Sequence, residues 1–142
     1  LTPHPQQLII DVYINVNTTQ VSRGTMFDHA SAEALVYLKE TYGVNKLEEY
    51  ADLFIYCVPK MEGWIAYAYV GGIQSVYGGQ WGRYLAALQH ELGHNFGLRH
   101  SHERSGGSIT PYTDRSGVMG GAVWGVHTKE NGPQMCFNAA SF

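Results

Sequence analysis

Three histidines near the middle of this chain have the spacing that suits a shared metal ion. Residues 90–100 read HELGHNFGLRH and fit the pattern H-E-x-x-H-x-x-G-x-x-H at all five fixed positions. His90 and His94 are one helical turn apart, about 40° around the axis, so both imidazoles can reach one ion. With His100 they form a three-histidine set with an open fourth position, as in catalytic rather than structural zinc sites.

The other two fixed positions of the pattern, Glu91 and Gly97, have distinct expected roles. Glu91 lies beside the ligands, and we expect it to act as general base and acid towards a zinc-activated water that attacks a carbonyl. Gly97 can adopt the left-handed conformation that ends a helix, so the chain is expected to turn there and bring His100 back to the ion. The remaining histidines are expected to have no metal role: His4, His29, His102 and His127.

The elements that must position this motif are predicted from hydrophobic periodicity. Strands are predicted at residues 8–16, 53–58 and 64–70, and residues 73–77 are predicted to be a hairpin partner or an edge strand. A short helix is predicted between the first long helix and the second strand. Beyond Gly97 the sequence is irregular, so mixed α/β structure is expected in the first two thirds of the chain.

Two longer helices are predicted. The first is capped by Asp28 and runs to about Tyr42, with Gly43 as its stop signal. The second covers residues 83–96 and carries the histidine motif. Its larger apolar side chains fall on the face opposite the histidines, which predicts that this apolar face packs on the core: Leu85, Leu88, Leu92 and Phe96.

The composition excludes several classes of protein. The chain has 142 residues, of which 44% are hydrophobic and 15% charged, so a single folded domain is expected rather than a disordered chain. The net charge is −3 and the nine basic residues are scattered, which leaves no basic face for nucleic acid. No apolar run approaches the roughly 20 residues needed to cross a bilayer. Cys57 and Cys136 are compatible with one disulfide or with two free thiols, and the sequence leaves both open.

The extended histidine motif resembles the signature of the metzincin metallopeptidases. Residues 89–101 are most similar to the gametolysin (autolysin) family. Residues 112–120 resemble the methionine turn of metzincins, which places Met119 beneath the metal. Residues 64–72 resemble the strand that precedes the active-site helix in such enzymes. The specific resemblance therefore covers residues 64–120, whereas the residues before it fit only by the order of their elements.

The resemblance implies a metzincin-like α/β (mixed α+β) fold. A twisted, mostly parallel sheet with helices would lie above an active-site cleft, and an irregular C-terminal part would lie below it. The whole chain, 1–142, is expected to be a single metallopeptidase catalytic domain with an upper subdomain at 1–99 and a lower one at 100–142. The lower subdomain is expected to be either minimal or cut within the family's last helix, which residues 138–142 would begin.

The resemblance also implies an activity. The chain is expected to be a secreted, monomeric zinc endopeptidase acting on extracellular proteins or cell-wall glycoproteins, with its polypeptide substrate extended along an edge strand. Residues 122–124 are expected to wall the pocket for the side chain after the scissile bond. Some metzincins place a zinc-binding tyrosine two residues after the turn methionine. That position is Gly121 here, so oxyanion help from Tyr112 or from another group is left open.

Two other functions compete with this one. A catalytically silent, zinc-containing binding module of the same fold would usually have lost the glutamate or a ligand, whereas Glu91 and all three histidines are present. A zinc hydrolase acting on something other than peptides is the third possibility. A peptide groove bounded by an edge strand would argue against that third function.

Overall fold

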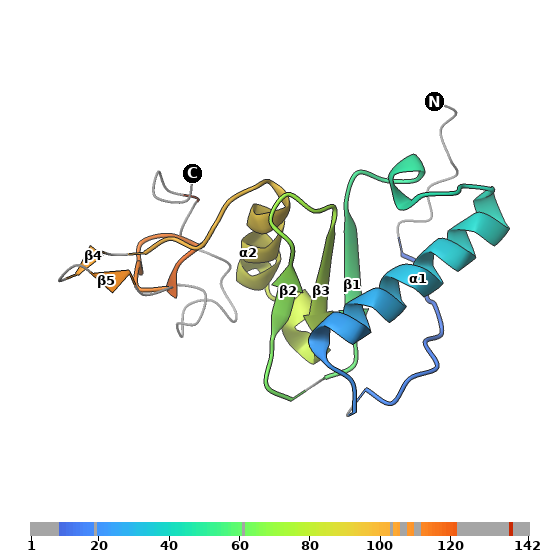
Figure 1. The fold of residues 1–142 in the computed structure, drawn as a ribbon, viewed down its shortest axis with the longest axis horizontal. Helices are drawn as coiled ribbons and strands as arrows, with labels where there is room; N and C mark the ends of the chain where they lie inside the picture. Colours follow the sequence, from blue (N-terminus) through green and yellow to red (C-terminus); the bar gives the residue numbers. More distant parts are fainter. Residues whose placement is uncertain are drawn as a thin grey trace.

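The computed structural model describes residues 9–18, 20–60, 62–102, 104–105, 108–109, 112–121 and 137. In chain order the elements are α1, the short 3-10 helix η1, strands β1 to β3, the 3-10 helix η2, α2 and the short strands β4 and β5 (Figure 1). This is the mixed α/β architecture expected from the sequence. None of the described helices is long and apolar enough to cross a membrane.

Helix α1 (Arg23–Tyr42) begins earlier than the sequence predicted. The Oγ of Ser22 accepts a hydrogen bond from the backbone N–H of Thr25 at 3.1 Å, so Ser22 and not Asp28 is the N-cap. The predicted end is confirmed: Gly43 adopts φ 73° and its N–H donates to the carbonyl of Lys39. The helix starts early because tertiary packing orders its first turn, where Met26 and Phe27 are buried in the core.

The sheet contains β1 (Phe54–Val58), β2 (Ala66–Ala68) and β3 (Gln74–Gly78) in the order β1-β3-β2. β1 pairs parallel to β3, and β2 pairs antiparallel to β3. The second pair confirms the predicted hairpin. β2 therefore lies at an edge of this sheet, next to α2 (Figure 1).

The main core lies between the first half of α1 and the sheet. It is built from α1 residues and from Val58 and Val76 of the strands, and partly buried aromatic side chains close its rim. Phe27 makes edge-to-face contacts with Tyr56 and Tyr67, whose ring centroids lie 6.3 and 6.0 Å away. This packing fixes the N-terminal end of α1 against β2.

The predicted first strand is absent from the described sheet. Residues 9–16 alternate in burial as a strand would, with Ile14 and Val16 turned towards the core and Ile9 and Tyr13 exposed. They pair with none of the described strands. The alternating pattern therefore indicated an extended segment with one apolar face. A β-strand also needs a neighbouring strand to hydrogen-bond with, and the periodicity of a single segment does not reveal one.

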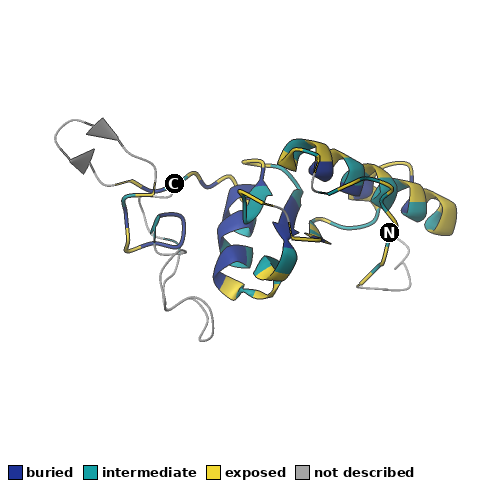
Figure 2. Ribbon diagram, turned by 90° about the horizontal axis from the view of Figure 1, so that it is seen from below, coloured by how far each residue is buried: buried dark blue, intermediate teal, exposed yellow. Residues whose placement is uncertain are grey.

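The prediction that the leucine face of α2 packs on the core was wrong. Helix α2 (Leu85–Asn95) follows η2 (Gly79–Arg83), and one side of it is buried (Figure 2). The buried residues include two alanines, His90, Glu91, Gly93 and His94, whereas Leu88 and Leu92 are only half-buried. Leu85 is 57% exposed and Phe96 is 66% exposed. The small side chains let the sheet and the segment around Met119 approach the helix closely, which the apolar periodicity alone could not indicate.

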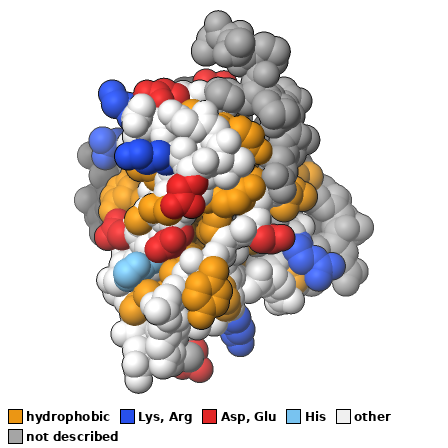
Figure 3. Space-filling model, turned by 90° about the vertical axis from the view of Figure 1, so that its right-hand side faces the viewer, with side chains coloured by type: hydrophobic (Ala, Val, Ile, Leu, Met, Phe, Trp, Pro, Cys, Tyr) orange, Lys and Arg blue, Asp and Glu red, His pale blue; other side chains and the backbone are white. Residues whose placement is uncertain are grey.

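The described C-terminal part is irregular apart from β4 (Arg104–Ser105) and β5 (Ser108–Ile109), which pair with each other. It is joined to α2 by a second small core of Ala86, Leu98, Val118 and Met119. Cys57 is an exposed free thiol, and Cys136 lies outside the described residues. On the face shown in Figure 3, acidic and basic side chains lie scattered between hydrophobic ones.

Candidate metal centre

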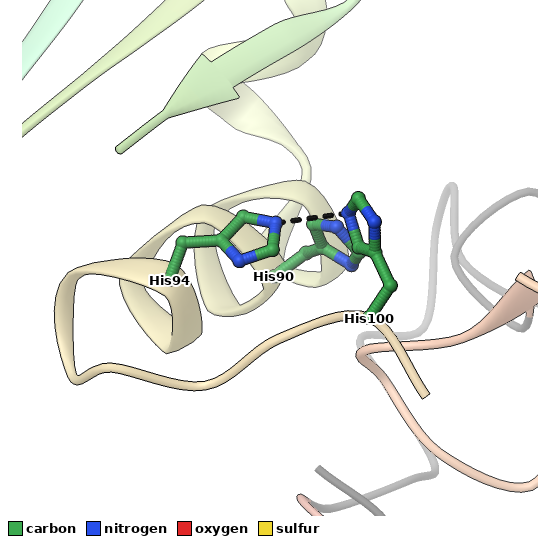
Figure 4. A group of neighbouring side chains, drawn as sticks. All are labelled: His90, His94 and His100. Atoms are coloured by element: carbon green, nitrogen blue, oxygen red, sulfur yellow. Dashed lines mark hydrogen bonds between the residues drawn. The ribbon is translucent and has the colours of Figure 1, made fainter. Parts of the chain in front are cut away.

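The three histidines of the motif converge on one point beside α2 (Figure 4). Each offers one ring nitrogen, and these three nitrogens lie within 4.8 Å of one another. The Nε2 atoms of His94 and His100 are 3.0 Å apart. Among the residues that the structure describes, this is the one group of three or more candidate ligand side chains that could hold a metal ion.

Backbone carbonyls set the orientation of two of these rings. The Nδ1 of His90 lies 2.7 Å from the carbonyl oxygen of Val118, and the Nδ1 of His94 lies 2.9 Å from that of Leu98. A carbonyl only accepts, so each Nδ1 must carry the proton and donate it. Neither Nε2 then carries a proton, so each can offer a lone pair towards the other histidines, which is the second-shell arrangement that metal-ligating histidines use.

The spacing of these rings also suits a metal ion. Because the Nδ1 of His94 donates to Leu98, its Nε2 can only accept, so in the 3.0 Å contact the Nε2–H of His100 donates to the Nε2 of His94, and a bound ion would take the place of that proton. Two imidazole nitrogens bound to a tetrahedral ion at about 2.0–2.1 Å would be about 3.3 Å apart, close to the separation that the fold already imposes. The residues present are therefore compatible with a tetrahedral divalent ion.

Burial keeps the imidazoles in the state that binds metal. It lowers the pKa of His90 and of His100 to about 4, and it also lowers the pKa of His94. The neighbouring imidazoles oppose protonation further, because two positive rings at this distance would repel. At neutral pH the three rings are therefore neutral and can each donate a lone pair.

The turn at Gly97 brings the third histidine back, as the sequence predicted. Gly97 has φ 90°, its N–H donates to the carbonyl of His94 at 2.9 Å, and the N–H of Leu98 donates to the carbonyl of Gly93 at 2.9 Å. This pair of bonds is a Schellman motif. An added Cβ would meet nothing within 4 Å, so the positive φ rather than crowding is what demands glycine here. The same turn presents the Leu98 carbonyl that orients His94.

Met119 lies directly against the ligand-bearing helix. It is fully buried, and a Cβ added to Gly93 would collide with its sulfur. The preceding carbonyl, of Val118, is the one that holds His90. The N–H of Ser101 donates to the carbonyl of Met119 at 3.0 Å, which ties the chain just after His100 to the same turn.

A buried aspartate holds this turn together. One carboxylate oxygen of Asp114 accepts from the N–H and the hydroxyl of Ser116, at 2.8 and 2.6 Å. The backbone carbonyl of Asp114 accepts from the N–H of Gly121 at 2.7 Å, and a Cβ on Gly120 would clash with that carbonyl. The turn therefore depends on close backbone approach, which only glycine permits at position 120.

Glu91 projects into the cleft beside the histidines and is only 6% exposed. Burial raises its pKa to about 8, and the positive charge of Arg23 opposes that rise. A buried carboxyl with a pKa near neutrality can both accept and return a proton at physiological pH. The cleft itself has a volume of about 410 Å³ and is lined by residues of β2 and α2 and by Arg23, Arg99, His100, His102 and Tyr112.

Tyr112, which the sequence left as one possible oxyanion donor, lines the cleft beside the histidines. Its ring centroid lies 4.0 Å from that of His100 and 6.2 Å from that of His90. Its φ of 66° is a strained conformation for a residue with a side chain, and such strain often accompanies functional sites. A Cβ added to Gly121 would clash with the carbonyl of Tyr112, so position 121 has no room for the tyrosine that some metzincins carry there.

The other predicted site residues fall elsewhere. His29 lies on α1 away from the centre, whereas His102 lines the cleft without joining the three-histidine set. His4, His127 and the expected pocket wall at 122–124 lie outside the described residues. Sequence reasoning missed Arg23, which lines the cleft from the start of α1. Nothing in the local sequence around Arg23 indicates this position, because only the packing of α1 on β2 creates it.

A mixed α/β domain with three convergent imidazoles, a buried carboxyl and an open cleft has the site of a metal-dependent hydrolase. The family model described as gametolysin peptidase M11 matches residues 5–142, and the chain belongs to this family of metallopeptidases. No curated protein and no solved structure matches the chain significantly.

The histidine centre predicts that a divalent metal stabilises the fold. A metal that binds only the folded state stabilises it by about 4 kcal/mol when the free ion is at about 1,000 times its dissociation constant. We expect Zn²⁺ to raise the thermal midpoint of chelator-treated protein and His94→Ala to abolish that rise. His29→Ala is the matched control and should keep it. Equal midpoints with and without metal in the unmodified protein would contradict the assignment.

The buried glutamate predicts a pH-dependent cost in the metal-free protein. The folded pKa of Glu91, about 8, lies above its ordinary value of 4.5, so its contribution to stability is lost as pH rises through the folded pKa. Glu91→Gln should therefore stabilise metal-free protein, and its advantage over the parent should grow by about 2 kcal/mol between about pH 6 and pH 8. Urea unfolding at both pH values measures this. Glu40→Gln, an exposed change on α1, should show no such growth.

Proposed function

We propose that this protein is a zinc-dependent endopeptidase that hydrolyses internal peptide bonds. The observation that carries the proposal is the set of three neutral, pre-oriented imidazoles next to a buried glutamate in an open cleft. Membership of the gametolysin peptidase family supports the reaction class. We propose extracellular proteins, including cell-wall glycoproteins, as substrates and secretion as the localisation.

The donor set favours zinc among the divalent metals. Three nitrogen ligands with a free fourth position are typical of catalytic zinc, whereas magnesium and calcium prefer oxygen ligands. Bound there, zinc would polarise the scissile carbonyl and lower the pKa of a water molecule towards about 7. The chain's own residues must then supply proton transfer and substrate position.

Glu91 is the proposed proton carrier. It lies next to His90 on α2, lines the cleft and has a pKa raised to about 8 by burial. The charge of a bound cation would favour its carboxylate form. As carboxylate it accepts a proton from the attacking water, and as carboxylic acid it returns that proton to the leaving amine. One group thus serves both halves of the reaction.

β2 is the proposed platform for the peptide substrate. Its three residues, Ala66, Tyr67 and Ala68, all line the cleft, and β3 pairs with only one of its two edges. An extended peptide can add to such an edge through main-chain hydrogen bonds and so present one of its carbonyls to the metal centre. The small alanine side chains leave room for that approach. We propose that the enzyme works as a monomer.

Tyr112 is the proposed donor to the oxygen that becomes negative on the attacked carbonyl. It lines the cleft, and its ring packs on His100. Burial and the charge of Glu91 raise the pKa of its phenol, so the hydroxyl keeps its proton and can donate it in a hydrogen bond. Arg23 acts in the opposite direction on this pKa.

Glu91→Ala tests the proposed reaction. The zinc-loaded variant should retain its metal but lose about 10²–10⁴-fold in turnover, because only the proton carrier is removed. The assay is digestion of an unfolded protein, with cleavage sites mapped by mass spectrometry, with and without a zinc chelator. Chelator-sensitive internal cuts by the parent are expected. An active Glu91→Ala enzyme would refute the assigned role, and a folded, zinc-loaded parent that cuts nothing would favour a binding module.

Tyr112→Phe tests the oxyanion donor. It should lower kcat by about 10–100-fold with KM little changed, because the hydrogen bond forms only as the carbonyl oxygen becomes negative. Metal content and thermal midpoint should stay at parental values. Tyr13→Phe removes a hydroxyl from an exposed residue outside the cleft lining and serves as control. A rise in KM at unchanged kcat would instead assign Tyr112 to ground-state binding.

A further inference from the structure

The described lining of the cleft has more arginines than carboxylates, whereas the chain as a whole has more acidic than basic residues. The protein as a whole is acidic, with twelve Asp and Glu against nine Lys and Arg. Yet the described residues that line the cleft include two arginines, Arg23 and Arg99, and Glu91 as their one carboxylate. That carboxylate is buried beside the histidines, whereas both arginines are exposed at the cleft surface.

Arg23 approaches the cleft from the start of α1. Its guanidinium lies 5.0 Å from the ring centroid of Tyr67 on β2, a cation–π contact that holds it over the proposed substrate strand. Its charge acts on both Glu91 and Tyr112, so it lies within electrostatic range of the reacting groups. The packing of Phe27 against Tyr67 fixes this approach.

Helix stability does not account for this arginine. A positive side chain in the first turn of a helix opposes the macrodipole, and the first turn of α1 contains no acidic residue to compensate. Arg23 is exposed and forms no ion pair with any carboxylate among the described residues. Its guanidinium, with donors in a planar fork, is thus available to an anion that enters the cleft.

Arg99 adds a second positive charge from a different element. It lies in the turn between Gly97 and His100, is exposed, and lines the same cleft. It too has no ion-pair partner among the carboxylates that the structure describes. The Schellman turn that returns His100 to the metal centre therefore also brings a cation to the edge of the substrate channel.

We propose that this cleft selects polypeptide substrates with an aspartate or glutamate next to the scissile bond, with Arg23 as the main specificity-determining residue and Arg99 as the second. The proposal rests on the endopeptidase activity proposed above. A cleft with low-dielectric walls and one sign of charge concentrates ligands of the opposite sign. An arginine also binds a carboxylate through two parallel hydrogen bonds, which a substrate with a neutral amide cannot match.

The test uses the zinc-loaded protein and quenched fluorescent peptides of one parent sequence. The residue on each side of the scissile bond is varied in turn between Glu, Gln and Lys. We expect kcat/KM for the Glu peptide to exceed that for the Gln peptide by about tenfold at one of these positions, with Lys lower still, since one charge-assisted hydrogen bond is at stake. Added salt should reduce this preference.

Variants identify the source of the preference. Arg23→Gln should remove most of the Glu-over-Gln ratio, Arg23→Lys should keep part of it, and combination with Arg99→Gln should abolish it. Arg83→Gln removes an exposed arginine of η2 outside the cleft lining and is the matched control. A ratio near one in the parent, or a ratio unchanged in Arg23→Gln, would overturn the proposal.

A binding measurement separates this inference from the proposed function. Fluorescence anisotropy of labelled Glu and Gln peptides on the Glu91→Gln variant measures preference without turnover. Cleavage of all peptides with no preference, and equal binding, would refute the charge selection while leaving the peptidase intact. Absence of cleavage, with Glu peptides still bound more tightly and in an Arg23-dependent way, would refute the peptidase and support the selective cleft.

Discussion

The candidate metal centre depends on two hydrogen bonds from imidazole Nδ1 atoms to backbone carbonyls. Val118 holds His90 and Leu98 holds His94, so both Nε2 lone pairs point inward before any ion arrives. Each carbonyl belongs to a turn that exists only because a glycine permits it, at Gly97 in one case and at Gly120 in the other. The site is therefore preorganised by backbone that lies outside the helix that carries the first two ligands.

This constraint explains the unusual burial pattern of α2. The helix turns its histidines, its glutamate and its small residues inward and leaves Leu85 and Phe96 exposed. Gly93 is the contact point, because Met119 fills the space that a side chain would need. Burial of these side chains lowers the pKa of His90 and raises the pKa of Glu91, because it disfavours the charged form of each.

Several elements contribute different functional groups to the cleft. β2 supplies an edge with free backbone groups, α2 supplies the ligands and the proposed proton carrier, and Tyr112 covers His100. Arg23 belongs to none of these elements and reaches the cleft because the core between α1 and the sheet sets the start of α1 over Tyr67. Specificity is thus proposed to come from a helix packed in the main core, and chemistry from the helix that the second small core joins to the C-terminal part.

The sequence by itself predicted that three histidines converge beside a glutamate, together with the helix and the glycine turn that bring them together, because these follow from local spacing and backbone conformation. It also indicated the β2–β3 hairpin and the end of α1 at Gly43. Tertiary structure decided which face of α2 is buried, that residues 9–16 join none of the described strands, and that Ser22 caps α1. It also decided that Arg23 and Tyr112 reach the cleft, because that position depends on contacts between segments far apart in the chain, which no local pattern encodes.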